Sequence, residues 1–136
     1  MFTIDHLGIA VKSLAAAKKF YEDLGMRIMP EETVESEKVQ LAMIPVGESR
    51  IELLEPTSDE SPIARFLAKR GEGLHHVALR VDNLVSTVER MKAAGTRFIS
   101  DEIKVGAGGH AYIFVHPSSA GGVLIELCQD QPSGVS

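Results

Sequence analysis

The sequence has little of several residue types that would place it in a particular class. It contains one cysteine and no tryptophan, and only 5% of its residues are aromatic. One cysteine cannot form an internal disulfide, so the disulfide framework of small secreted domains is excluded. The scarcity of aromatic rings argues against a platform on which nucleic-acid bases would stack.

The chain also lacks an excess of positive charge and any long apolar run. Its 14 Lys and Arg against 19 Asp and Glu give a net charge of −5, whereas a nucleic-acid surface needs clustered cations. No stretch approaches the ~18 apolar residues of a membrane span. The N-terminal "MFTIDHLGIAV" does not have the pattern of a signal peptide. We therefore expect a cytoplasmic protein that binds neither nucleic acid nor membrane.

What the sequence does contain is an internal repeat. Residues 5–29, "DHLGIAVKSLAAAKKFYEDLGMRIM", align without a gap on residues 75–99, "HHVALRVDNLVSTVERMKAAGTRFI". The shared register indicates two copies of one module. The identical positions include His6 with His76, Val11 with Val81, Leu14 with Leu84, Gly25 with Gly95 and Arg27 with Arg97.

The apolar spacing predicts the same order of elements, βαβββ, in both copies. Each copy opens with a strand around its histidine and continues with a helix whose apolar residues recur every three to four positions. Gly25 and Gly95 stand where a left-handed residue would end that helix. Strands are predicted at 38–46 and 50–55 in the first copy, and at 111–115 and 122–128 in the second.

The segment between the copies, "SPIARFLAKRGEG", predicts a separate helix. Ser61 suits the N-cap, Pro62 the first turn and Gly71 the end. We expect a single domain over residues 1–130 followed by a flexible tail at 131–136. Module 1 would cover about 3–56, the linker helix about 61–71 and module 2 about 73–128. The predicted fold class is α+β.

Each module carries a histidine on its first strand and a glutamate on its last: His6 with Glu52, and His76 with Glu126. Both glutamates sit in apolar runs, "IELL" and "IELC", and a buried carboxylate is costly unless a cation or hydrogen-bond donors meet it. If the modules pack with two-fold pseudosymmetry, the four side chains form a ligand set suited to a divalent metal.

Structural roles remain open for each of these residues taken singly. A histidine in a strand is commonly a core residue, and a glutamate in a strand commonly faces solvent. In "HHV" either His75 or His76 could point inward, and the register of the repeat selects His76.

Several segments resemble the vicinal-oxygen-chelate superfamily and, within it, the methylmalonyl-CoA epimerase family. They are "IDHLGIAV…FYEDLGM", "IELLEPT", "GLHHVALRV" and "FVHPSSAGGVLIEL", and the resemblance runs from about residue 3 to residue 129. It implies paired βαβββ modules forming a curved mixed sheet around a metal site, usually in a homodimer. The implied metal ligands are His6, Glu52, His76 and Glu126. Co²⁺ or Mn²⁺ is expected, and Zn²⁺, Ni²⁺ or Mg²⁺ would also suit this ligand set.

The implied activity is the epimerisation of methylmalonyl-CoA in propionate metabolism. The proton between the thioester and the carboxylate would be removed through a metal-stabilised enolate and returned on the opposite face. Glu126 is the expected proton carrier. Some relatives place a second acid at the position of Leu41, which cannot carry a proton, and Gln40 does not titrate. Glu37, His110 or a bound water could substitute, so the second carrier stays unassigned.

Another departure from the family lies in "HPSSAGG", where relatives often carry lysine and this chain has Ser118. Ser118, Ser119 and the amides near Gly121 could bind the substrate carboxylate, or they could form an ordinary polar turn. On the linker helix, Arg65, Lys69 and Arg70 could contact the phosphates of coenzyme A or form a solvated face.

Two other functions are consistent with the same fold. A glyoxalase I-type lactoylglutathione lyase shares the ligand plan, but the linker helix and the "HPSSAGGVLIEL" segment favour the epimerase. A metal-free small-molecule-binding protein need not retain four metal ligands, so the intact set argues against it.

Overall fold

The computed structural model describes residues 2–130, which divide into two compact units. The first unit comprises His6–His75, and the second comprises residues 2–5 together with residues 76–130. The tail predicted at 131–136 lies outside the described residues. Over the described range, every helix is too short or too polar to cross a membrane.

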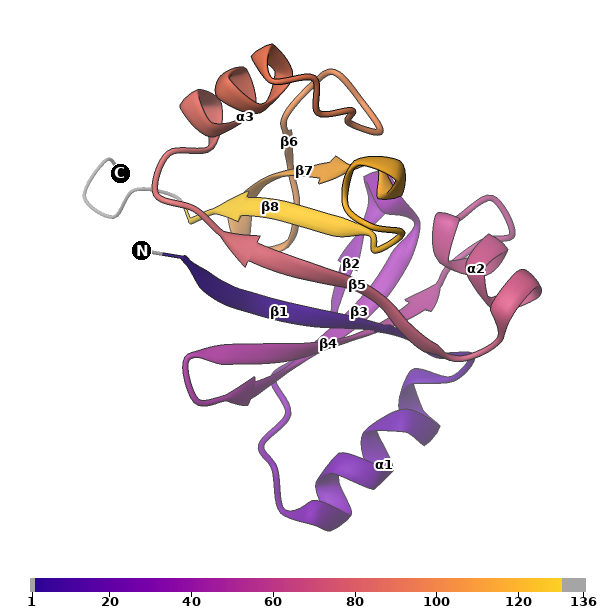
Figure 1. Ribbon diagram of the computed structural model, residues 1–136. Coiled ribbons are helices and arrows are strands. Elements are labelled where there is room, and N and C mark those ends of the chain that lie inside the picture. Colours follow the sequence, from indigo (N-terminus) through magenta and orange to yellow (C-terminus); the bar gives the residue numbers. More distant parts are fainter. Residues whose placement is uncertain (1, 131–136) are drawn as a thin grey trace. The chain divides into compact units, whose positions relative to one another are not determined.

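The first unit is a four-stranded arrangement in the order β2-β3-β4-β1, with α1 on one face (Figure 1). Neighbouring strands are antiparallel except β1 and β4, which are parallel. The elements are most of β1 (Thr3–Ala10), α1 (Leu14–Leu24), β2 (Glu32–Val34), a 3₁₀ turn (Glu35–Glu37), β3 (Val39–Val46), β4 (Ser49–Pro56) and α2 (Pro62–Arg70).

The second unit repeats this topology in the order β6-β7-β8-β5, with α3 on one face (Figure 1). Here β5 and β8 form the parallel pair, and the other pairs are antiparallel. The elements are most of β5 (Gly73–Arg80), α3 (Leu84–Ala93), β6 (Lys104–Val105), a 3₁₀ turn (Ala107–Gly109), β7 (Ala111–Val115), a second 3₁₀ turn (Pro117–Ser119) and β8 (Ile125–Gln129). The predicted repeat of βαβββ modules is confirmed.

The sequence did not locate the outermost strands, and it started the last strand too early. β2 and β6 have only three and two residues, too few to show an alternating pattern. β8 begins at Ile125 rather than at 122. The reason is that Gly121 and Gly122 have φ values of 65° and 87°, in the left-handed region, which belongs to a turn and not to a strand.

The helices begin and end at the residues expected from their chemistry. The Ser61 hydroxyl accepts the Ile63 N–H at 3.1 Å and starts α2, which ends at Gly71. Gly25 and Gly95 both have φ of 95°, the left-handed conformation expected after α1 and α3. These signals are local, which is why the sequence shows them.

In each module a side chain at the end of the last strand caps the first residue of the helix, a contact that no sequence pattern predicted. Glu55 Oε1 accepts the Leu14 N–H at 2.6 Å, and Gln129 Oε1 accepts the Leu84 N–H at 2.6 Å. Glu55 and Gln129 each stand three residues after a candidate metal ligand. Because an unsatisfied first-turn N–H is costly, each bond stabilises the helix and holds the end of its strand.

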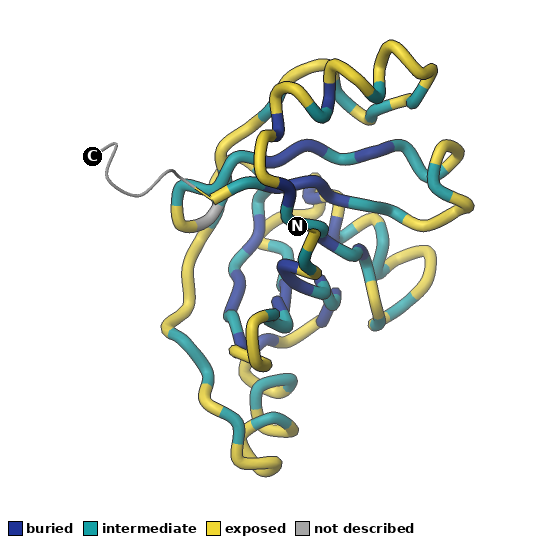
Figure 2. The backbone as a smooth tube through the Cα atoms, turned by 60° about the vertical axis from the view of Figure 1, so that its left-hand side comes forward, coloured by how far each residue is buried: buried dark blue, intermediate teal, exposed yellow. Residues whose placement is uncertain are grey.

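The core of each unit lies between its helix and its strands. In the first unit Leu14, Ile44 and Leu53 are almost completely buried, and in the second Leu84, Ile113 and Leu127 are. Buried positions concentrate on the strands while the outer faces of the helices are exposed (Figure 2). Since successive strand residues face opposite ways, Glu52 and Glu126 lie on the face away from these helices.

Candidate metal centre

In the second unit, His76 and Glu126 form a buried pair on two neighbouring parallel strands. Ala78 of β5 lies opposite Glu126 of β8, and His76 lies two residues before Ala78, hence on the same face. His76 Nε2 is 3.1 Å from Glu126 Oε1, and the side chains are only 4% and 11% exposed. Their donor atoms are close enough together to hold a metal.

In the first unit, His6 and Glu52 repeat this arrangement. Gly8 of β1 lies opposite Glu52 of β4, and His6 lies two residues before Gly8. His6 Nε2 is 3.3 Å from Glu52 Oε1, with exposed side-chain fractions of 6% and 9%. The small residue opposite each glutamate, Gly8 or Ala78, leaves room for the imidazole beside the carboxylate.

The two adjacent histidines at 75 and 76 have different environments. His76 is buried beside Glu126, as the register of the repeat predicts, whereas His75 is half-buried and packs edge-to-face on Phe66 with ring centroids 5.0 Å apart. Successive strand residues face opposite ways, so only one of the two can share the face of the glutamate.

Apolar side chains flank both glutamates. Phe114 of β7 lies opposite Glu126 and packs edge-to-face on His76 with ring centroids 5.4 Å apart. Met43 of β3 holds the equivalent place opposite Glu52. In such low-dielectric surroundings a carboxylate needs a compensating partner. Imidazole nitrogen and carboxylate oxygen are ligands for a divalent metal, so the donor chemistry of each pair fits one.

The positions considered for a second proton carrier differ in how they lie relative to the glutamate of their own unit. Leu41 is 2% exposed and shares the strand face of Glu52, because it stands two residues before Met43, the residue opposite Glu52. Gln40 donates to Glu31 at 2.9 Å. His110 Nδ1 contacts Asp130 at 2.8 Å. His110 stands four residues before Phe114, the residue opposite Glu126 on the neighbouring strand. Four strand residues correspond to ~13 Å. Glu37 ends the 3₁₀ turn that precedes β3, six residues before Met43, the residue opposite Glu52.

The "HPSSAGG" segment is a tight turn between β7 and β8. His116 Nδ1 accepts the Ser118 N–H at 3.0 Å and lies 2.8 Å from the Ser118 hydroxyl. The Ser119 hydroxyl accepts the N–H of Arg97 at 2.9 Å. Both serines therefore organise the turn, and Arg97, which occupies the same repeat position as Arg27, is part of it.

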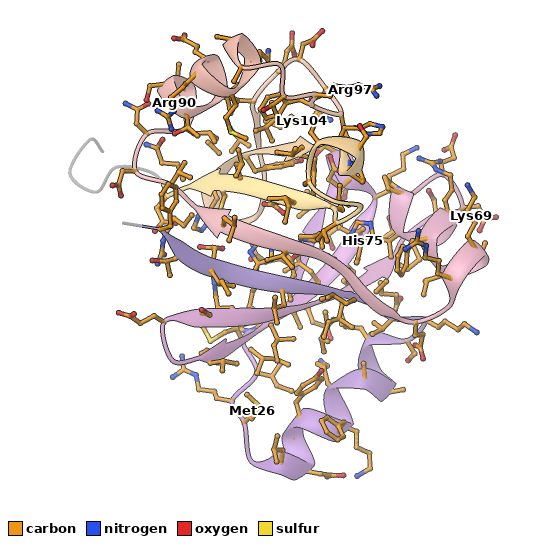
Figure 3. The ribbon with its side chains drawn as sticks, viewed as in Figure 1. Met26, Lys69, His75, Arg90, Arg97 and Lys104 are labelled. Carbon is orange, nitrogen blue, oxygen red and sulfur yellow. The ribbon has the colours of Figure 1, made fainter. Side chains whose placement is uncertain are left out.

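The cations of α2 are arranged as a solvent-facing group. Arg65 donates to the Glu60 carbonyl at 2.9 Å, and the Arg70 guanidinium stands 6.0 Å from the centre of the Phe66 ring. Figure 3 shows Lys69 extending away from the helix. These contacts indicate a solvated face. The helix α2 itself contains no acidic residue that could pair with the three cations.

The fold and the site define a class. Residues 5–114 match the Glyoxalase/Bleomycin resistance protein/Dioxygenase superfamily. Together with two repeated βαβββ modules and a buried His–Glu pair in each, this match identifies the glyoxalase-like fold that the sequence resemblance implied.

The relatives narrow this class to one family. The chain is 39% identical over 128 residues to the mitochondrial methylmalonyl-CoA epimerase of Mus musculus, covering 93% of this chain and 72% of that protein. It is 37% identical to the methylmalonyl-CoA epimerase of Mycobacterium tuberculosis, whose crystal structure gives a TM-score of 0.90 over 95% of this chain and 88% of that one. A third epimerase structure, 34% identical with a TM-score of 0.90 over 95% and 94% of the two chains, holds methylmalonyl-CoA and NH4+. The chain belongs to the methylmalonyl-CoA epimerase family of this superfamily, and the resemblance stated from the sequence is confirmed.

Proposed function

We propose that this protein is a metal-dependent epimerase that interconverts (2R)- and (2S)-methylmalonyl-CoA. The observation that carries the proposal is the pair of buried His–Glu contacts, at 3.3 Å and 3.1 Å, at equivalent places in the two modules. Family membership supports it, because relatives 34–39% identical are named methylmalonyl-CoA epimerase and one holds methylmalonyl-CoA.

We infer that His6, Glu52, His76 and Glu126 together hold one divalent metal ion. The support is chemical: two imidazoles and two carboxylates are a ligand set suited to a divalent metal, and a cation would neutralise carboxylates that are buried among apolar side chains. Co²⁺ or Mn²⁺ is the ion we expect. When bound, such an ion supplies Lewis-acid stabilisation of the negative charge that develops on the thioester oxygen.

Glu126 is the residue that we propose removes the α-proton. A carboxylate can contact a metal through one oxygen and accept a proton on the other, so the two roles are compatible. Phe114 and Ala78 lie opposite Glu126 on the two neighbouring strands, and the Glu126 side chain is only 11% exposed. A proton taken from the substrate is therefore protected from the bulk solvent until it is returned or exchanged.

Return of the proton on the opposite face requires a second carrier, and we propose a bound water. Leu41 cannot titrate. His110 precedes β7 and stands four residues before Phe114, the residue opposite Glu126, and Glu37 belongs to the 3₁₀ turn before β3. A bound water requires no titratable side chain on the strand face of Glu52, where this chain has Leu41.

The decisive experiment is exchange of the α-proton of methylmalonyl-CoA in deuterated buffer with Co²⁺-loaded protein, followed by mass spectrometry. We expect deuterium at the α-carbon together with loss of optical purity. The glutathione hemithioacetal of methylglyoxal, assayed on the same sample, tests the lyase alternative. Turnover of the hemithioacetal without α-exchange would contradict the proposal, and a sample that retains no added metal would favour a binding role.

The family resemblance also predicts a homodimer. Light scattering of the purified, metal-loaded protein is expected to give twice the mass of one chain. A mass of one chain at micromolar concentration would contradict the predicted homodimer. It would not affect the epimerase proposal, which the exchange experiment tests separately.

A further inference from the structure

The ring of Phe114 contacts the imidazole of His76 across an intervening strand. β8 lies between β5, which carries His76, and β7, which carries Phe114 (Figure 1). Two strand spacings amount to roughly 9.6 Å, yet the two ring centroids are only 5.4 Å apart, with the rings at 88° to each other. The side chains therefore converge over β8, where Glu126 is the residue opposite Phe114.

Phe114 is itself held in place by a second ring. Its centroid is 5.9 Å from that of Tyr112, at an interplanar angle of 79°, and Tyr112 is buried. A Cβ built on Gly106 would come within 2.9 Å of Tyr112 Cε1, so the Gly106 backbone lies directly against the tyrosine ring. The Gly106 N–H donates to the His110 carbonyl at 2.9 Å, which fixes this backbone. Phe114 therefore presents a rigid surface to the imidazole.

The two modules differ at these positions. Phe114 and Met43 are equivalent, because each lies opposite the glutamate of its own module. Two residues earlier on each strand, the first module has Leu41 where the second has Tyr112. An unbranched thioether adapts its shape readily, whereas paired aromatic rings have a preferred geometry. At these two positions β3 offers His6 no ring, so the rigid contact on the imidazole belongs to the second module.

We propose that Phe114 is a positioning residue, which holds the His76 imidazole in the orientation that a metal ligand needs. Phe114 offers no ligand atom, and its role is to keep Nε2 of His76 directed at Glu126, 3.1 Å away. An imidazole that is already oriented loses less rotational freedom when an ion binds, so the affinity for the ion is higher. The inference rests on the proposed function, because that proposal makes His76 a ligand.

The chain offers a matched control for the loss of this ring. Phe98 is also half-buried in the second unit, but it packs against the core cluster that contains Leu84 and Val88 of α3. Phe98→Met and Phe114→Met remove the same ring and add the same side chain. A general loss of packing should therefore affect both variants alike, whereas a loss of imidazole orientation should appear in Phe114→Met alone.

The test measures the Kd of the metal-free protein for Co²⁺ by calorimetry. Phe114→Met should raise this Kd ~5-fold, the usual value of one aromatic pair expressed as an affinity. Phe98→Met should bind Co²⁺ as the wild type does, and Phe114→Tyr should also do so because it keeps the ring. The visible absorption bands of bound Co²⁺, which report the geometry of its ligands, should change in Phe114→Met alone.

A Co²⁺ Kd unchanged in Phe114→Met, or raised as much in Phe98→Met or Phe114→Tyr, overturns the inference. A wild-type protein that binds no Co²⁺ would reject the metal-dependent function instead, and the role of Phe114 is then decided without metal. NMR relaxation of the His76 ring carbons should show a more mobile imidazole in Phe114→Met than in wild type or Phe98→Met. Equal mobility in all three proteins would overturn the positioning role as well.

Discussion

His76 Nε2 and Glu126 Oε1 lie 3.1 Å apart, on two parallel neighbouring strands that belong to one module. The first module repeats the relationship with His6 and Glu52 at 3.3 Å. In both pairs an imidazole stands beside a carboxylate that is shielded from water. A divalent ion would supply the positive charge that a buried carboxylate requires, and this requirement generates the first three predictions below.

Replacing Glu126 by Gln should abolish exchange of the substrate α-proton while preserving the fold. Glutamine is nearly isosteric with glutamate and cannot accept the proton, so a loss of ~10²-fold or more is expected for removal of a general base. Mass spectrometry of methylmalonyl-CoA incubated in deuterated buffer provides the measurement. Glu55→Gln is the control, because Glu55 accepts a backbone N–H of α1. Wild-type exchange by Glu126→Gln would remove this residue from the mechanism.

Replacing Glu52 by Ala should weaken metal retention. The change removes one carboxylate ligand and half of the charge that the two glutamates bring to the proposed site. Elemental analysis after dialysis should show less Co²⁺ per chain than in the wild type. In Glu55→Ala, which removes a carboxylate three residues away on the same strand, metal content should not change. Equal metal content in Glu52→Ala and wild type would contradict the ligand assignment.

Removing the metal with a chelator should lower the thermal unfolding midpoint, and adding Co²⁺ should restore it. An ion present at 100 times its Kd stabilises the folded state by about 2.7 kcal/mol. Differential scanning calorimetry gives the measurement. The double variant His76→Ala, Glu126→Gln should respond much less to the chelator. If this variant and the wild type responded alike, the stabilising ion would have to bind elsewhere.

Replacing Gln129 by Ala should destabilise the second module by about 1 kcal/mol, the usual contribution of a side chain that caps a helix N-terminus. The reason is that the Leu84 N–H would lose its acceptor, now 2.6 Å away. Glu55→Ala should cost a similar amount through Leu14. Urea unfolding measures both changes, and Gln40→Ala, at an exposed contact with Glu31, provides the reference. Unfolding free energies unchanged in both cap variants would show that these bonds are not needed for stability.

Local chemistry made much of the architecture predictable. The 70-residue register of the repeat placed His6 on His76 and Gly25 on Gly95, and both glycines have the left-handed conformation that ends a helix. Apolar periodicity placed the helices and the longer strands, because burial repeats every two residues in a strand and about every 3.6 in a helix. The outer strands β2 and β6 were missed because they are too short to show either period.

The sequence by itself determined the two modules, the four candidate ligands and the family, because each depends on the order and spacing of residues along the chain. Only the tertiary structure decided that Gly8 lies opposite Glu52, that Ala78 lies opposite Glu126 and that Arg97 braces the turn at Ser119. Strand register and loop contacts are set by hydrogen bonds between residues far apart in the chain, and no local pattern records them.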